Sequence, residues 1–253
     1  MKNKFIILLI FTTTILFGQS NFHFNRDLPC VDKQFNLFVH AVNNTKYKTV
    51  TEDKMREAIE RANEIFAPIC ISFKMCEMDT VFNYNYDILG YHEMKELSNL
   101  YVQHNRINVY VIHTTFFNPY IKEICMGSID SMRNGNLFIS QLNALPQVLG
   151  HFFGLQHTHK GSGEELVDGS NCKTAGDKIC DTPADPYVFG TQINPYITGD
   201  CTFKSLKTDA NGEYYTPDVT NVMSGFFYCH CKFSNEQYLK MAENYFKAAQ
   251  KHW

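Results

Sequence analysis

Two histidines and a glycine in the middle of the chain have a spacing that suits a metal site. His151, Gly154 and His157 stand three residues apart. A helix can present the first histidine, the glycine lets the chain turn sharply, and the second histidine can then reach the same ion. Later in the chain, the string NVMS around Met223 reads as a tight turn that would place this methionine beneath the ion. Imidazole is a common zinc ligand, so the sequence predicts a zinc-type site.

The two residues one helical turn before His151 decide what such a metal could do. Gln147 would lie on the same helix face as His151, but its amide oxygen is a poorer zinc ligand than imidazole. Val148 has no group that accepts a proton, whereas metal-assisted hydrolysis of a peptide needs a general base. We expect zinc to bind weakly or not at all through Gln147, His151 and His157, and we expect no catalytic residue at position 148.

The pattern resembles the second half of the metzincin zinc-protease signature, H-E-x-x-H-x-x-G-x-x-H followed by a Met-turn. The chain is similar to the pappalysin-like family, peptidase family M43, over residues 35–250, most closely in the strings HTHKG, ELVDGSNC, AGDKICDTPADP and NVMS. The resemblance implies an α/β metzincin-like fold with Met223 as the Met-turn methionine. It also exposes three departures: Gln147 replaces the first zinc histidine, Val148 replaces the catalytic glutamate, and Gly225 replaces a common tyrosine.

Three functions remain open. The three departures favour a secreted homologue without catalysis, which binds a peptide or protein in the old cleft or competes with an active paralogue. The retained histidines leave room for an active zinc metalloendopeptidase with atypical ligands, in which Glu123, His159, Glu164 or Glu165 supplies the missing group. We expect His159 to point away from the site. The third function is a structural exported domain with no ligand in the cleft.

The first twenty residues indicate export. Lys2 and Lys4 precede an apolar run over residues 5–17, which is shorter than the about 20 residues that span a bilayer. Gly18 and Ser20 are small residues suited to a cut after Ser20, so we expect a signal peptide over 1–20 and a secreted or periplasmic protein. Its removal changes the formal charge from -3 to -5. No basic block is present, which argues against nucleic-acid binding, and no second apolar stretch favours a membrane.

Strands that alternate with helices up to about residue 145 indicate an α/β layer. We expect strands at 35–42, 71–78, 107–113 and 137–140. We expect helices after a Thr49/Glu52 capping pair, at 94–103, at 146–153, and after a Ser234/Gln237 capping pair. The Gly-, Asp- and Pro-rich residues between the last two helices predict mostly loop.

These elements predict one domain over residues 21–253 with two subdomains. The upper one, about 21–154, would hold a twisted, mostly parallel mixed sheet with helices. The lower one, about 155–253, would be loop-rich, stapled by disulfides and closed by the C-terminal helix. A cleft would run between them, with the strand 137–140 as an edge to which an extended peptide could add.

Nine cysteines follow the expected cut, and an exported protein can form disulfides. The odd number leaves at least one thiol outside an intramolecular bridge. The family resemblance implies two bridges in the C-terminal part, which we place at Cys172–Cys201 and Cys180–Cys229.

Aspartates in the loop-rich segment allow two interpretations. Oxygen-rich flexible loops suit calcium, and the resemblance implies structural calcium in such a place. The alternative is a solvated acidic loop with aspartates at turns. The candidate ligands are Asp168, Asp177, Asp181 and Asp185.

Overall fold

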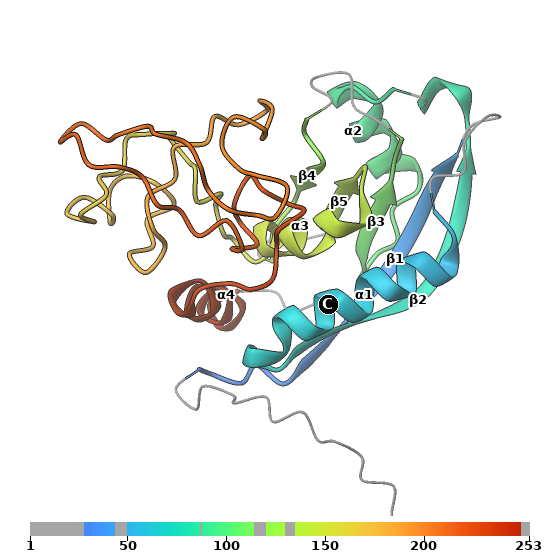
Figure 1. The fold of residues 1–253 in the computed structure, drawn as a ribbon. Coiled ribbons are helices and arrows are strands. Elements are labelled where there is room, and N and C mark those ends of the chain that lie inside the picture. The colour runs from blue at the N-terminus through green and yellow to red at the C-terminus, as the bar shows by residue number, and fades with distance from the viewer. Residues whose placement is uncertain (1–27, 44–49, 87, 114–119, 130–134, 249–253) are drawn as a thin grey trace, which may run out of the picture.

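The computed structural model describes residues 28–43, 50–86, 88–113, 120–129 and 135–248. The expected signal peptide and Thr49 lie outside these ranges. A sheet with covering helices is followed by a long segment without regular structure and a C-terminal helix (Figure 1). This arrangement confirms the expected α/β fold. No helix among the described residues is long and apolar enough to cross a bilayer.

The sheet has five strands in the order β2-β1-β3-β5-β4. Neighbouring strands run parallel except β4, which pairs antiparallel with β5. Four of the five strands match the predicted ones, although β2 is longer than expected. The strands are β1 (Lys33–Asn43), β2 (Ile71–Phe82), β3 (Ile107–Val111), β4 (Glu123–Met126) and β5 (Gly135–Ile139).

The expectation that residues 137–140 form the edge of the sheet is wrong. Residues 137–139 belong to β5, which lies between β3 and β4 and is buried along its whole length, and Ser140 follows it. The edge is β4, a strand that the sequence analysis missed because its four residues show no alternation of apolar and polar side chains. The antiparallel register sets Glu123 opposite Ile139, at the end of β5 from which the chain continues towards α3.

Helices cover both faces of the sheet. Alternate residues of β3 and β5 point to opposite faces. Val109 and Leu137 join the core under α1 (Glu52–Phe66) and α3 (Leu145–Phe152). Tyr110 and Phe138 join a second core with α2 (Tyr91–Leu100). Short 3-10 turns at Ala67–Ile69, Tyr84–Tyr86 and Leu142–Ala144 complete this part.

The start of α1 differs from the prediction. The helix begins at Glu52, and the hydroxyl of Thr51 accepts the backbone N–H of Lys54. Thr51 is therefore the cap, and the predicted pairing of Thr49 with Glu52 is wrong because Glu52 is already the first helical residue. The capping box at the other end of the chain is confirmed: Ser234 and Gln237 cap α4 (Asn235–Lys247) reciprocally.

Residues 155–234 are all described, and they form no helix or strand beyond isolated bridges. Two disulfides staple this segment, but not in the predicted pairs. Cys172 bonds to Cys180 with a Cα–Cα distance of 5.1 Å, and Cys201 bonds to Cys229 with 5.8 Å. The predicted pairs Cys172–Cys201 and Cys180–Cys229 are wrong, because turns bring each cysteine to a nearer partner at a bridging distance.

A third disulfide joins Cys30 and Cys70, and so ties the start of β1 to the start of β2. Cys76, Cys125 and Cys231 remain as free thiols among the described residues.

Candidate metal centre

Helix α3 and the turn after it bring the two predicted histidines together. Pro146 lies in the first turn of α3, and Gly154 follows its end with a φ of +91°, a conformation that favours glycine. The rings of His151 and His157 then lie 4.3 Å apart between centroids, at 77° to each other. The Nδ1 of His151 donates to the carbonyl of Leu155 at 2.9 Å. This bond fixes the ring and leaves the lone pair of Nε2 open to a ligand.

The third member of the site is Glu123, from the edge strand β4. Its Oε1 lies 3.6 Å from Nε2 of His151 and 3.5 Å from Nε2 of His157. In the described part of the chain, these three residues form the one group of His, Cys, Asp or Glu that could hold a metal together. The sequence analysis named Glu123 among the replacement groups, but spacing gave no reason to prefer it, because the unpredicted strand β4 positions it.

Gln147 lies next to this group but presents its nitrogen to it. Its Nε2 donates to the carbonyl of Ser224 at 2.8 Å and lies 3.4 Å from Nδ1 of His157. The amide oxygen, which would have to bind a cation, is not the atom that faces the histidine. The donor set of Gln147, His151 and His157 therefore does not fit zinc as the amide is placed, whereas two imidazoles and a carboxylate do.

The other two positions at which the chain departs from the metzincin pattern are Val148 and Gly225. Val148 is fully buried in the main core, with Leu145 and Leu149 of the same helix. A Cβ at Gly225 would lie 2.9 Å from Cγ of Tyr187 and closer still to Cδ1 and Cε1. The Tyr187 ring thus lies against the position of the missing tyrosine, and its hydroxyl donates to the carbonyl of Thr191.

Met223, the residue named for the Met-turn, packs against Gly150 of α3. It is fully buried, and a Cβ at Gly150 would lie 2.6 Å from its Sδ. Its carbonyl accepts the backbone N–H of Thr158, beside His157, and its own N–H is held by the side chain of Asn221. Met223 therefore contacts α3 with its side chain and holds the residue after His157 with its carbonyl.

His159 does not point away from the site. Its ring stacks on His157 at 4.6 Å and 24° and is almost fully buried. Neither of its ring nitrogens has a hydrogen-bond partner among the described residues. Burial, with smaller contributions from His151 and His230, lowers its pKa to about 3, so the ring is neutral. Glu164 and Glu165 lie outside the ligand group.

Burial and charge act in opposite directions on the three clustered groups. Burial works to raise the pKa of Glu123, but the two imidazoles bring it below its ordinary value. Burial works to lower the pKa of His151, but the Glu123 carboxylate and the Leu155 carbonyl raise it overall. Burial, with the charge of His151, holds the pKa of His157 well below its usual range. The two imidazoles therefore favour the ionised form of Glu123, and His157 is the histidine whose neutral form is favoured most strongly.

The four aspartates considered as calcium ligands have separate partners within the chain. Asp168 and Asp181 are exposed: Asp168 accepts the backbone N–H of Ser170, and Asp181 accepts the backbone N–H of Glu236 and the Ser234 hydroxyl at the start of α4. Asp177 and Asp185 are buried and accept threonine hydroxyls and backbone N–H groups. They do not belong to the metal-holding group found among the described residues.

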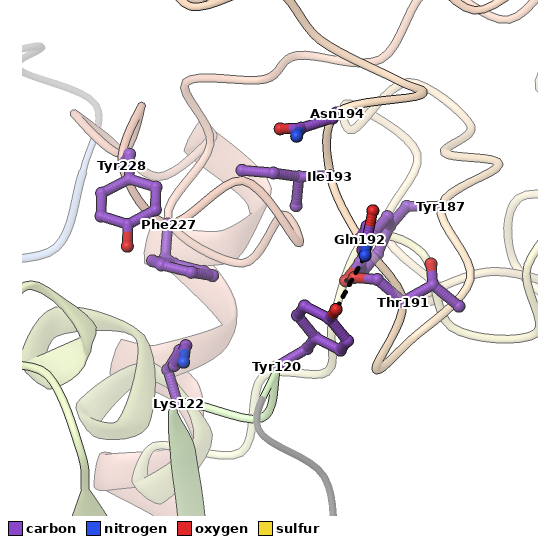
Figure 2. A pocket seen from close by; sticks show the side chains of 9 residues that line it. All are labelled: Tyr120, Lys122, Tyr187, Thr191, Gln192, Ile193, Asn194, Phe227 and Tyr228. Atoms are coloured by element: carbon purple, nitrogen blue, oxygen red, sulfur yellow. Dashed lines mark hydrogen bonds between the residues drawn. The ribbon is translucent and has the colours of Figure 1, made fainter.

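One pocket contains the ligand group, and a second lies nearby. One, of about 380 Å³, is lined by Glu123, His151, His157, Cys125 and Phe189, among others. The other, of about 400 Å³, is aromatic and is shown in Figure 2. A chamber of about 20 Å³ shares walls with both.

The aromatic pocket is built from three segments. Tyr120 and Lys122 come from the chain before β4, residues 187–194 form one wall, and Phe227 and Tyr228 form the opposite one (Figure 2). The side-chain amide of Gln192 in the first wall donates to the Tyr120 hydroxyl at 2.9 Å. The pocket therefore offers aromatic surface and one cation to a side chain placed in it.

No family model and no curated protein matches the sequence. Solved structures do share the fold. Mature mirolysin of Tannerella forsythia in complex with a cleaved peptide has a TM-score of 0.57 and 16% identity, over 82% of this chain and 89% of that one. A promirolysin mutant of the same organism has a TM-score of 0.58 and 16% identity, over 86% and 81%.

Mirolysin in complex with compound 9 has a TM-score of 0.59 and 15% identity, over 87% of this chain and 94% of that one. Mirolysin is a metzincin-type metallopeptidase. The chain therefore has the fold of this type of metallopeptidase, with Glu123, Gln147 and Val148 close to His151 and His157.

Proposed function

We propose that the chain is a secreted, pappalysin-like homologue of zinc metallopeptidases that does not hydrolyse peptides and binds an extended peptide in the old cleft. One observation carries the loss of catalysis: Val148 stands at the general-base position and is fully buried in the core. A valine can neither take the proton from an attacking water nor return it to the leaving amine.

The loss of the general base should lower the rate of peptide hydrolysis by a large factor. General acid–base assistance typically contributes about 10²–10⁴ in rate. Gly225 lacks the tyrosine hydroxyl that is common at this position in the similar family and that would help to stabilise an oxyanion. Export is supported by the pattern of residues 1–20 and by three disulfides, which persist in oxidising compartments.

Peptide binding is supported by the edge of the sheet. In the described part, β4 pairs with β5 on one side and ends the sheet on the other. An extended peptide that pairs with β4 would run past the ligand group and could place a side chain in the aromatic pocket. Mature mirolysin, which shares the fold, has been solved with a cleaved peptide.

A second candidate function has one observation in its favour. The carboxylate of Glu123 lies within 3.6 Å of both histidines, so it could act as a base from the opposite side of the site. The protein would then be an active metalloendopeptidase with an unusual base, and Glu123→Gln would abolish its activity.

Peptidase assays separate these candidates. We expect no chelator-sensitive cleavage of an unstructured protein by the wild-type chain. We also expect the double variant Gln147→His with Val148→Glu to gain cleavage from a background of none. Chelator-sensitive cleavage by the wild-type chain, abolished in Glu123→Gln, would establish the second candidate instead.

Binding of a fluorescent library of extended peptides tests the rest of the proposal. Tyr228 and Tyr214 are both 61% exposed, but only Tyr228 lines the aromatic pocket. Tyr228→Ala should weaken binding by about tenfold or more, since buried aromatic residues dominate recognition, and Tyr214→Ala should leave it unchanged. Absence of binding to any peptide would favour a structural exported domain.

A further inference from the structure

We propose that Glu123, His151 and His157 bind a divalent transition metal, zinc by preference, with Glu123 as the third ligand in place of residue 147. The family resemblance places all ligands on α3 and the turn after it. The geometry instead adds one ligand from β4, on the other side of the site. The inference concerns metal binding alone and does not depend on whether the cleft binds a peptide.

The distances between the ligand atoms carry the inference. A metal with bonds of about 2.0–2.1 Å and tetrahedral angles holds its ligand atoms about 3.4 Å apart. The Oε1 of Glu123 lies 3.6 Å and 3.5 Å from the two imidazole Nε2 atoms. A direct charge-assisted hydrogen bond would bring these atoms to about 2.7–2.9 Å. Both distances from Glu123 are thus those of ligand atoms that share an ion rather than of a direct hydrogen bond, and all three ligand atoms lie within 4.8 Å of one another.

The histidines are also supported as metal ligands. The Nδ1–H of His151 donates a hydrogen bond to the Leu155 carbonyl, so the lone pair of His151 lies on Nε2, the nitrogen that faces Glu123. The Nδ1 of His157 faces Gln147 at 3.4 Å, which is longer than an ordinary hydrogen bond and does not fix the ring with its proton on Nε2. The short hydrogen bond of Gln147 is the one that its Nε2 donates to the Ser224 carbonyl at 2.8 Å, and His230 contacts the same carbonyl through its Nε2.

Burial and ligand type indicate which ion fits. The Glu123 side chain is only 6% exposed, and a buried carboxylate needs a cation beside it. Two imidazoles and one carboxylate suit zinc, whereas calcium and magnesium prefer oxygen ligands alone. The group opens onto the pocket of about 380 Å³, so a position remains for a ligand's carboxylate or carbonyl. Cys125 lines this pocket, but its thiol donates to the Gly127 carbonyl.

A crossed pair of variants tests the assignment with zinc and cobalt alone as probes. The chain is purified without chelator and without a metal-binding tag, and metal content, affinity and the visible spectrum of the cobalt form are measured. We expect about one ion per chain and the absorption of tetrahedral cobalt. Glu123→Gln should weaken the affinity by more than about 100-fold, and Gln147→Ala by less than about tenfold.

Glu77→Gln is the matched control, since Glu77 is an exposed glutamate on strand β2. Should Glu123→Gln fail to fold, Glu123→Asp keeps the charge, retracts it by one methylene group and should still weaken binding. The proposal is overturned if the wild-type chain binds no zinc at saturation. It is also overturned if Gln147→Ala abolishes binding while Glu123→Gln retains it, because Gln147 would then be the ligand. Peptidase activity does not enter either result.

Discussion

Replacing Gly225 by alanine should destabilise the protein, although alanine is among the mildest substitutions. Gly225 is not among the residues with positive φ, so its backbone accepts any residue and the whole cost is steric. The new Cβ would lie 2.9 Å from Cγ of Tyr187 and closer to two other ring carbons, where an ordinary contact needs 3.4 Å or more. The ring must therefore shift inside a packed aromatic cluster of Tyr187, Tyr196 and Phe226.

Overpacking of this kind costs about 1–3 kcal/mol, and we expect the upper end because Tyr187 is only 3% exposed. Tyr187→Ala alone should cost about 3–5 kcal/mol, because it leaves a cavity. In that background Gly225→Ala should cost almost nothing, which gives a coupling energy of about 2–3 kcal/mol. Urea unfolding of the four chains of this cycle measures each term.

Gly199→Ala serves as the control, because no atom lies within 4 Å of a Cβ there and its φ is not positive. It should be neutral or stabilising by up to about 1 kcal/mol. An equal cost of Gly225→Ala with and without the Tyr187 ring would refute the steric argument.

Three further predictions concern the loop-rich segment and the first helix. Burial is the first cause that raises the pKa of Glu165 and Asp177 to about 7 and that of Asp185 to about 6. Because the folded chain holds protons that the unfolded chain has released, the free energy of unfolding should fall between about pH 4 and 7. In urea titrations, Asp177→Asn should make the free energy of unfolding less dependent on pH. A free energy of unfolding that rises between about pH 4 and 7 would contradict the prediction. Replacing Cys172 and Cys180 by alanine should cost about 2.5 kcal/mol and replacing Cys201 and Cys229 about 3.6 kcal/mol, because the second bridge closes a longer loop. Peptide mapping of the non-reduced chain checks both pairs, and a Cys172–Cys201 fragment would disprove them. Thr51→Ala should cost about 1 kcal/mol, whereas Thr80→Ala, away from any helix start, should cost less in the same thermal assay.

The elements that follow from local sequence were predictable. The apolar runs of β1, β2, β3 and β5, the proline in the first turn of α3 and the capping box of α4 each depend on residues close in the chain. Both histidines of the candidate site share this property, because one helix and one turn place them. The pairing His151–His157 could therefore be inferred from spacing.

Glu123 could not be inferred in the same way. Its position depends on the register of β4 against β5, and β4 has neither the length nor the alternation that marks a strand. The predicted disulfide pairs were wrong for a related reason. Several connectivities fit the same cysteines, and only the three-dimensional course of the loops selects one. The contact of Tyr187 with Gly225 joins two loops and leaves no trace in the pattern of either.

The open edge of the sheet also bears on the solubility of the protein. A strand that ends a sheet is a template for any other strand, including that of a second copy of the same chain. Here the template is only four residues long, and its first side chain is an inward-pointing carboxylate. Short edges and inward charges are features by which natural sheets resist edge-to-edge aggregation. The Glu123 carboxylate therefore has a second consequence beside metal binding: Glu123→Gln should aggregate more readily than Glu77→Gln.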